Sequence, residues 1–277
     1  MPERPLPTTS PFEILRPDLP RGGYKAVLFD FDGTLSLIRE GWHRIMISMC
    51  VEALQATGSG ELEAELAQLS EDFVMALNGQ PAIFQMVRLA EEMKLRGGHP
   101  KSPEAYLAEY DRRLGVVVQQ RSREILEKLV SHERWAVPGS HGILEALSRR
   151  GSKLFLASGT QLRFVRSEAE LLLLSSYFGT EINAPDDNDT TFSKRGVIER
   201  IMKENNLLGE ELLSFGDGVV ETEEVRRVGG TAVAVASDET PGDINRWKRD
   251  RLVPAGADVV IADYRGYEKL LAWLFGT

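Results

Sequence analysis

The second half of the chain alternates short apolar runs with amphipathic segments, and this alternation limits the possible folds more than any other feature. Strands are predicted at 153–157, 211–215, 231–236 and 258–261. Helices are predicted at 141–149, 161–174, 194–206, 219–228 and 265–275. Continuous apolar strands that alternate with helices are typical of a buried parallel sheet with helices on both faces. The sequence therefore predicts an α/β fold.

An earlier apolar run, Lys25 to Phe31, predicts another strand of the same sheet, bounded by Gly22-Gly23 and Gly33. The next ninety or so residues have a different character. Helical spacing is found at 42–57, 61–78, 81–96 and 103–131, and no convincing strand interrupts it. We interpret this all-helical segment as an insertion after the first strand of the α/β domain.

Residues 1–22 form a proline-rich arm. The density of proline excludes a helix or a central strand there, so the arm is expected to be extended or disordered. Apolar side chains at Phe12, Ile14 and Leu15 could hold part of it against the body. Its six prolines are Pro2, Pro5, Pro7, Pro11, Pro17 and Pro20.

The net charge of −9 makes nucleic acid and anionic membranes poor partners, so neither is expected. An anionic substrate must then be attracted by a local positive site or a bound metal. The single cysteine, Cys50, allows no internal disulfide and is expected to be buried. No apolar stretch approaches the roughly 20 residues that span a bilayer, and the N-terminus lacks a signal pattern. We expect a cytoplasmic protein.

Polar residues follow several of the predicted strands at their carboxyl ends, where ligands bind in doubly wound folds. Asp30 and Asp32 follow the first strand, Ser158 and Gly159 the second, and Asp217 a later one. These distant segments should converge on one crevice. Lys194, at the start of a predicted helix, could point there too.

The carboxylates in this set suit a divalent cation. Asp30 and Asp32 are two positions apart on an extended segment, so their side chains project to the same side and repel each other without a cation. Asp217 adds a third oxygen donor and Glu221 a possible fourth. Hard oxygen donors favour Mg²⁺, which also binds substrate phosphate. This interpretation requires Asp217 to share a pocket with Asp30 and Asp32.

Phosphomonoester cleavage fits these residues. Repulsion between an attacking carboxylate and an anionic phosphate is its main obstacle, and Mg²⁺ with Lys194 would reduce it. Backbone N–H groups near Gly33 and Gly159 can hold phosphate oxygens. We predict that Asp30 is the nucleophile and that Asp32 protonates the leaving oxygen and later deprotonates water.

The segment Asp30-Phe31-Asp32-Gly33-Thr34-Leu35, together with Ser158, Lys194 and the stretch Gly216 to Glu221, resembles the four signature motifs of the haloacid dehalogenase superfamily. The resemblance spans 24–275. It implies a Rossmann-like core with a helical cap inserted after the first motif, and a phosphate site that includes Gly33, Thr34, Ser158, Gly159 and Lys194. It also implies that Asp30 gives a side-chain oxygen, and Asp32 its backbone carbonyl, to Mg²⁺.

We expect a core at 23–38 and 133–277 and a cap at 39–132 that opens and closes over the crevice on hinges near 35–41 and 132–138. Family dehalogenases lack the second aspartate, so Asp32 argues against dehalogenation. Glu221 stands where the fourth motif usually has aspartate, and it binds the metal directly, through water, or not at all. Arg39, Trp42 and His43, at the cap entry, are candidate substrate residues.

Three functions remain open from the sequence. The first is a Mg²⁺-dependent hydrolase of a small phosphorylated metabolite. The second is a phosphosugar mutase that uses the same phospho-aspartate. The third is a non-catalytic protein of the same fold that binds phosphometabolites.

Overall fold

The computed structural model describes residues 12–78, 80–186, 189, 191–237 and 243–277. Within these residues, one seven-stranded sheet has the order β1-β7-β6-β5-β2-β3-β4. Neighbouring strands run parallel, except that β1 pairs antiparallel with β7. The strands are β1 (Phe12–Ile14), β2 (Ala26–Phe29), β3 (Lys153–Ala157), β4 (Ile182–Asn183), β5 (Leu212–Gly216), β6 (Thr231–Val235) and β7 (Val259–Ile261).

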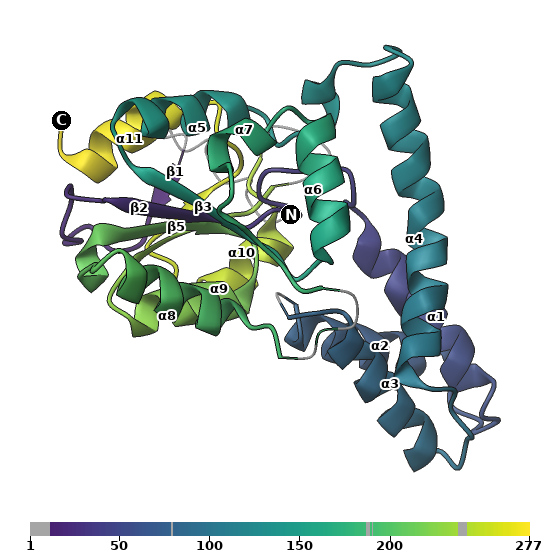
Figure 1. Cartoon of the computed structure of the whole chain (residues 1–277). Coiled ribbons are helices and arrows are strands. Elements are labelled where there is room, and N and C mark those ends of the chain that lie inside the picture. Colours follow the sequence, from purple (N-terminus) through teal and green to yellow (C-terminus); the bar gives the residue numbers. More distant parts are fainter. Residues whose placement is uncertain (1–11, 79, 187–188, 190, 238–242) are drawn as a thin grey trace, which may run out of the picture.

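Helices cover both faces of the sheet (Figure 1). One face carries α5 (Ser140–Arg149), α6 (Leu162–Leu171), α7 (Ser175–Phe178) and α11 (Tyr267–Phe275), and the other carries α8 (Lys194–Glu204), α9 (Val219–Arg227) and α10 (Arg246–Leu252). Side chains alternate along β2: Val27 and Phe29 join the cluster with α5 and α11, whereas Ala26 and Leu28 join the one with α8 and α9. The predicted α/β fold is confirmed.

Most of the segment between β2 and α5 folds into a helical cap beside the sheet (Figure 1). Its helices are α1 (Trp42–Gln55), α2 (Glu63–Ala76), α3 (Ile83–Leu95) and α4 (Pro103–Leu126). They bury a hydrophobic cluster of their own that includes Met46, Leu54, Met86 and Leu89. Cys50 is buried in the same cluster, as expected.

The two connections between cap and core lie side by side. The N–H of Leu37 donates to the carbonyl of Trp135 at 2.7 Å, and the N–H of Val137 donates to the carbonyl of Leu35 at 2.9 Å. Arg121 of α4 donates from Nη1 to the carbonyls of Leu37, Ile38 and Glu40, each at 2.9 Å. Residues on both predicted hinges therefore pair with each other, and a cap helix holds one of them.

Some elements differ from the sequence prediction. The arm contributes β1, an edge strand held by Phe12 and Ile14, while residues 1–11 lie outside the described residues. The predicted helix 161–174 ends at Leu171, because Leu173 has a positive φ of 58°, and α7 follows. The predicted helix 103–131 ends at Leu126. Neither β4 nor α10 was predicted. Among the described helices, none combines the length and apolar character needed to cross a membrane.

Candidate active site

The carboxyl ends of β2, β3 and β5 bring three predicted site residues together. Phe29 pairs in register with Leu156 on one side and Phe215 on the other, so Asp30, Ser158 and Asp217 follow neighbouring strand ends. These residues line one cavity of about 110 Å³ between the sheet and the cap, together with Asp32 and Lys194. The shared pocket that the sequence interpretation required is present.

Lys194 lies beside the predicted nucleophile. Its side chain is only 3% exposed, and Nζ is 2.6 Å from Oδ1 of Asp30 and in contact with Oε2 of Glu221. Burial works to lower the pKa of Lys194, but the carboxylates of Asp30 and Glu221 outweigh it and raise the pKa overall. The ammonium therefore stays charged next to Asp30.

Glu221 is held at the start of α9. Its Oε1 accepts a hydrogen bond from the N–H of Gly218 at 2.9 Å, and its Oε2 contacts Lys194. Both oxygens thus have a partner within the chain. This geometry suits a residue that positions Lys194, and it leaves the predicted contact of Glu221 with metal as a prediction.

One group of acidic oxygens could hold a cation. Carboxylate oxygens of Asp30, Asp217 and Glu221 all lie within 4.8 Å of one another. Burial raises the pKa of Asp30 well above its ordinary value, and the neighbouring Glu221 carboxylate raises it further. The ammonium of Lys194 does not offset the repulsion among these carboxylates. A bound cation would reduce it. Hard oxygen donors in this arrangement fit Mg²⁺.

Asp32 faces a different set of partners. Thr160 donates from Oγ1 to Oδ2 of Asp32 at 2.7 Å, and Ser158 donates from Oγ to the same oxygen at 3.4 Å. Nε of Arg39 is 3.9 Å from Oδ1, which accepts no hydrogen bond from the described residues. Burial raises the pKa of Asp32, although Arg39 and Thr160 act in the opposite direction. Asp32 is thus suited to carry a proton.

The predicted phosphate-site glycines make close approaches. Gly33 has a positive φ of 74°, and a Cβ there would clash with Oδ2 of Asp217. A Cβ on Gly159 would lie 2.9 Å from the carbonyl oxygen of Gln80, in the cap. The cap therefore approaches the core closely at Gly159.

Thr34 is fully buried and is not among the described residues that line the cavity.

Lys248 is a residue of this site that the sequence reasoning missed. It lies on α10, is 7% exposed, and places Nζ 3.1 Å from Oδ2 of Asp217. The same ammonium is 3.5 Å from Oε2 of Glu40 and 3.3 Å from Oγ of Ser237. No motif or spacing in the sequence marks it.

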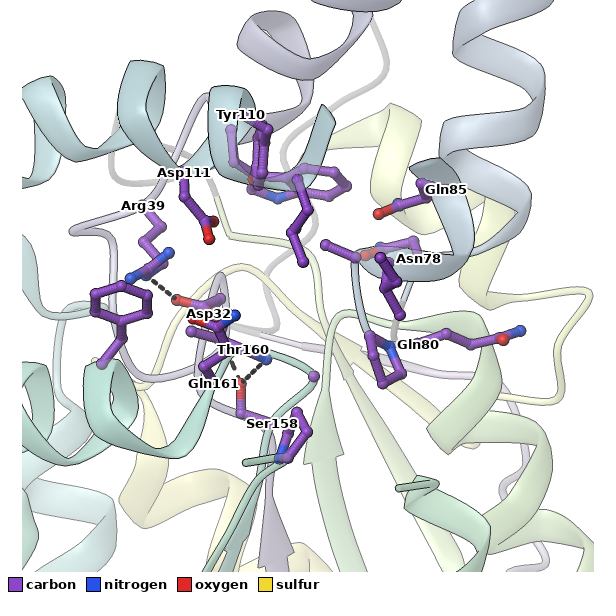
Figure 2. Close-up of a pocket in the computed structure, with 18 of the residues that line it drawn as sticks. Asp32, Arg39, Asn78, Gln80, Gln85, Tyr110, Asp111, Ser158, Thr160 and Gln161 are labelled. Atoms are coloured by element: carbon purple, nitrogen blue, oxygen red, sulfur yellow. Dashed lines mark hydrogen bonds and ion pairs between the residues drawn. The ribbon is translucent and has the colours of Figure 1, made fainter. Parts of the chain in front are cut away.

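The candidate substrate residues separate into two groups. Arg39 and Trp42 line the cavity, whereas His43 lines a smaller neighbouring pocket and stacks on Trp247 at 5.5 Å between ring centroids. Figure 2 shows cap residues that line the cavity opposite Asp32 and Thr160. These cap residues, which the sequence did not single out, are Asn78, Gln80, Gln85, Tyr110 and Asp111.

Solved structures with the same fold cover nearly the whole chain. A predicted phosphoglycolate phosphatase from Haemophilus somnus has a TM-score of 0.56 and 16% identity, and the match covers 90% of this chain and 98% of that one. A predicted phosphatase from Clostridium acetobutylicum has a TM-score of 0.56, 17% identity and the same coverage. A β-phosphoglucomutase from Clostridium difficile has a TM-score of 0.56 and 14% identity, with 91% and 97% coverage.

The sequence comparisons are narrower. No curated protein sequence matches this chain. The family model of the haloacid dehalogenase-like hydrolases matches residues 24–229, which include β2, the cap and all the predicted motif residues. The chain therefore belongs to the haloacid dehalogenase-like hydrolases.

Proposed function

We propose that the protein is a Mg²⁺-dependent phosphatase that hydrolyses a small phosphomonoester through an aspartyl-phosphate on Asp30. The observation that carries the proposal is the position of Asp30. Its carboxylate lies in the cavity, 2.6 Å from the buried ammonium of Lys194 and within 4.8 Å of the carboxylate oxygens of Asp217 and Glu221. A carboxylate beside an ammonium, in a group of oxygens that could hold Mg²⁺, could approach an anionic phosphate.

In the first step, an oxygen of Asp30 forms a bond to phosphorus while the bond from phosphorus to the leaving alcohol breaks. Lys194 balances part of the negative charge on Asp30 and the phosphoryl group. The backbone N–H of Gly159 is the candidate donor to a phosphoryl oxygen, whereas the N–H of Gly33, which the sequence also suggested, donates to the carbonyl of Ser36 at 2.8 Å. Mg²⁺, held by Asp30, Asp217 and the Asp32 carbonyl, with Glu221 as a further candidate, would neutralise the remaining charge.

Asp32 moves the protons. Its raised pKa allows it to hold a proton, which it gives to the leaving oxygen during the first step. In the second step, water attacks phosphorus and loses its proton to Asp32, and the Asp30 carboxylate is released with inorganic phosphate. Thr160 and Ser158 donate to Oδ2 of Asp32, which leaves Oδ1, 3.9 Å from Nε of Arg39, as the oxygen that could carry the proton.

The test is Asp30→Asn in purified protein with Mg²⁺ and p-nitrophenyl phosphate. We expect loss of phosphate release in the variant. Acid-quenched wild type should carry one phosphoryl group on the peptide that contains Asp30. Control measurements of thermal unfolding establish that the variant is folded. Phosphate release that survives the substitution rules out Asp30 as the nucleophile.

A mutase is the second candidate, because the fold matches the β-phosphoglucomutase structure as well as it matches the phosphatases. A mutase returns the phosphoryl group from Asp30 to the sugar phosphate. Product analysis with hexose phosphates separates the two functions, since a mutase yields the isomer and little inorganic phosphate. Mg²⁺ binding without turnover of any phosphometabolite would favour the third candidate, a binding protein.

A further inference from the structure

The wall of the cavity that faces Asp32 has a distinct chemistry. Aromatic rings and carboxamides line it together with aliphatic side chains, and Figure 2 shows Tyr110 and Asp111 of α4 extending toward Arg39 and Asp32 from the cap side. This wall surrounds the leaving group of a phosphoryl ester bound at Asp30. Its polar and aromatic members include Trp42, Asn78, Gln85, Tyr110, Asp111 and Gln161, and Met46, Ile83 and Leu107 are among its aliphatic ones.

Positive charge is scarce on this wall. Among the described residues that line the cavity, the basic ones are Arg39 and Lys194. Lys194 is engaged with Asp30 and Glu221 at the phosphate end. The positions between 12 and 277 that the structure leaves undescribed are Gly79, Asp187, Asn188, Thr190 and 238–242, and the sequence has no basic residue at any of them.

Arg39 is already paired within the chain. Its Nε donates to both carboxylate oxygens of Glu168 at 3.0 Å, and its Nη2 donates to Oε1 at 2.7 Å. Arg39 is 8% exposed and Glu168 only 3%, so water screens this pair weakly. The guanidinium also lies 4.9 Å above the ring of Phe164. Glu168 and Phe164 on α6 therefore fix and neutralise the cation nearest to the leaving group.

Acidic side chains share the same cavity. Asp111 lines it from the cap, and Asp186 and Asp189 line it from the core. A second phosphate or a carboxylate on the substrate would lie near these carboxylates. The two basic residues that line the cavity, Arg39 and Lys194, are already paired with other carboxylates. At the short distances of a half-buried cavity, this repulsion is strong.

We propose that the substrate is a phosphomonoester whose leaving group is an uncharged, hydrogen-bonding alcohol, and that Glu168 enforces this choice by occupying Arg39. This inference rests on the proposed phosphatase function and narrows it. Carboxamides at Asn78 and Gln161 can donate to and accept from hydroxyl groups, whereas that of Gln85 already donates to the carbonyl of Val74 at 2.8 Å, and the rings of Trp42 and Tyr110 offer apolar faces to a polyol. Glu168 does not touch the substrate and acts as a positioning residue.

The proposal separates this chain from two proteins with a similar fold. Phosphoglycolate, named for one of them, carries a carboxylate beside its phosphate. A β-phosphoglucomutase is named for another, and return of a phosphoryl group from Asp30 to a sugar phosphate would form a bisphosphate. Both reactions place a second anion in the region where Arg39 is already neutralised.

The experiment compares pairs of phosphomonoesters in which one leaving group is uncharged and the other carries a second anionic group. Turnover of p-nitrophenyl phosphate with Mg²⁺ is measured first and tests the phosphatase function alone. The matched pairs are 2-hydroxyethyl phosphate with phosphoglycolate, glycerol 3-phosphate with 3-phosphoglycerate, and glucose 1-phosphate with glucose 1,6-bisphosphate. We expect kcat/KM to be at least about tenfold higher for the member of each pair whose leaving group is uncharged. Equal values, or a preference for the second anion, overturn the inference while leaving the phosphatase function intact.

Absence of all turnover rejects the phosphatase function, and the same pairs then decide the inference by binding. The Mg²⁺-loaded protein should show a larger thermal shift with the uncharged members. A larger shift with the bis-anionic members overturns the inference in that case as well.

Two variants test the residues responsible. Glu168→Gln releases Arg39 and should narrow the kcat/KM ratio within each pair by about tenfold, through a lower KM for the bis-anionic member. Asp111→Asn removes a negative charge from the cavity without touching the buried pair, so it should narrow the ratio even if Glu168→Gln fails to fold. Glu170→Gln, an exposed change on the same helix, is the matched control and should leave the ratio unchanged. Unchanged ratios in folded Glu168→Gln and in Asp111→Asn overturn the proposal.

Discussion

The ammonium of Lys248 lies 3.1 Å from Oδ2 of Asp217, so a predicted metal ligand is already paired with a second buried lysine. Lys248 also faces Glu40, and its replacement leaves two carboxylates without that partner. We expect Lys248→Met to lower the free energy of unfolding of metal-free protein by about 3–5 kcal/mol, the usual cost of breaking a buried pair. Mg²⁺ should then stabilise the variant more than wild type, because the cation no longer shares Asp217 with an ammonium.

Thermal unfolding with and without Mg²⁺ measures both effects. Lys269→Met, on the exposed side of α11, removes the same charge away from the site and should change neither. An equal Mg²⁺-induced rise in Tm for wild type and Lys248→Met contradicts the view that Lys248 and the metal share Asp217.

Gly33 and Gly58 form a natural matched pair for substitution. Their φ values are 74° and 73°, so alanine at either position carries a similar backbone cost of about 1–2 kcal/mol. A Cβ at Gly33 clashes with the Asp217 carboxylate, whereas a Cβ at Gly58 meets no atom within 4 Å. We expect both variants to lose stability, Gly33→Ala the more because of its clash, and only Gly33→Ala to lose Mg²⁺-dependent activity. Comparable activity in the two variants would show that Asp217 need not hold its position.

Contact between the cap and the core can be tested at Gly159. Its Cβ would lie 2.9 Å from the backbone oxygen of Gln80, so alanine should hold the cap loop away from the core. A displacement near 1 Å costs up to about 100-fold in rate, and we expect kcat of Gly159→Ala to fall toward that limit. Gly115→Ala on α4, with no atom within 4 Å of its Cβ, controls for the change of residue type. A wild-type kcat in Gly159→Ala would mean that closure at this contact is not needed.

The role of Asp32 predicts a dependence on the leaving group. Asp32→Asn removes the acid for the first step and the base for the second, effects of about 10²–10⁴-fold each. p-Nitrophenolate leaves without protonation, so this variant should release one equivalent of nitrophenol quickly and then stall. Alkyl phosphates should react slowly from the start. Rapid-mixing measurements distinguish the two patterns, and a steady wild-type rate with an alkyl phosphate would remove Asp32 from the mechanism.

The hydrogen bond from Thr160 to Asp32 should also affect how kcat/KM depends on pH. Burial raises the pKa of Asp32, so with an alkyl phosphate kcat/KM should fall as pH rises through that pKa and Asp32 loses its proton. The Thr160 hydroxyl favours the charged carboxylate and lowers this pKa. Thr160→Val should therefore raise the pKa and move the alkaline fall in kcat/KM to higher pH. A shift to lower pH would assign the fall to another group.

Most of the cavity's phosphate end could be predicted because its residues follow chain segments with strong local signals. Asp30, Ser158 and Asp217 come directly after apolar strands, and the carboxyl ends of parallel strands meet at one edge of the sheet. Lys194 begins a helix that packs on the same sheet. Local sequence therefore placed these side chains without knowledge of tertiary packing.

The residues that the sequence missed depend on packing between distant elements. Helix α10 has only seven residues, too few for a helical period to be visible, so the site of Lys248 left no pattern. Glu168 looks like one more acidic residue on an amphipathic helix until Arg39 is placed against it. The direction of cap residues such as Asp111 is set by how α4 packs on the other cap helices. For the same reason the sequence grouped His43 with Trp42, although His43 stacks on Trp247.

The short strand β1 covers one edge of the sheet. Phe12, Glu13 and Ile14 pair with β7, whose backbone would otherwise present a row of free donors and acceptors at the sheet boundary. A chain that lacks residues 1–14 would keep its cavity and its cap, but the backbone of β7 would become an exposed edge strand. Such a chain is expected to associate with copies of itself at concentrations where the longer chain stays dispersed.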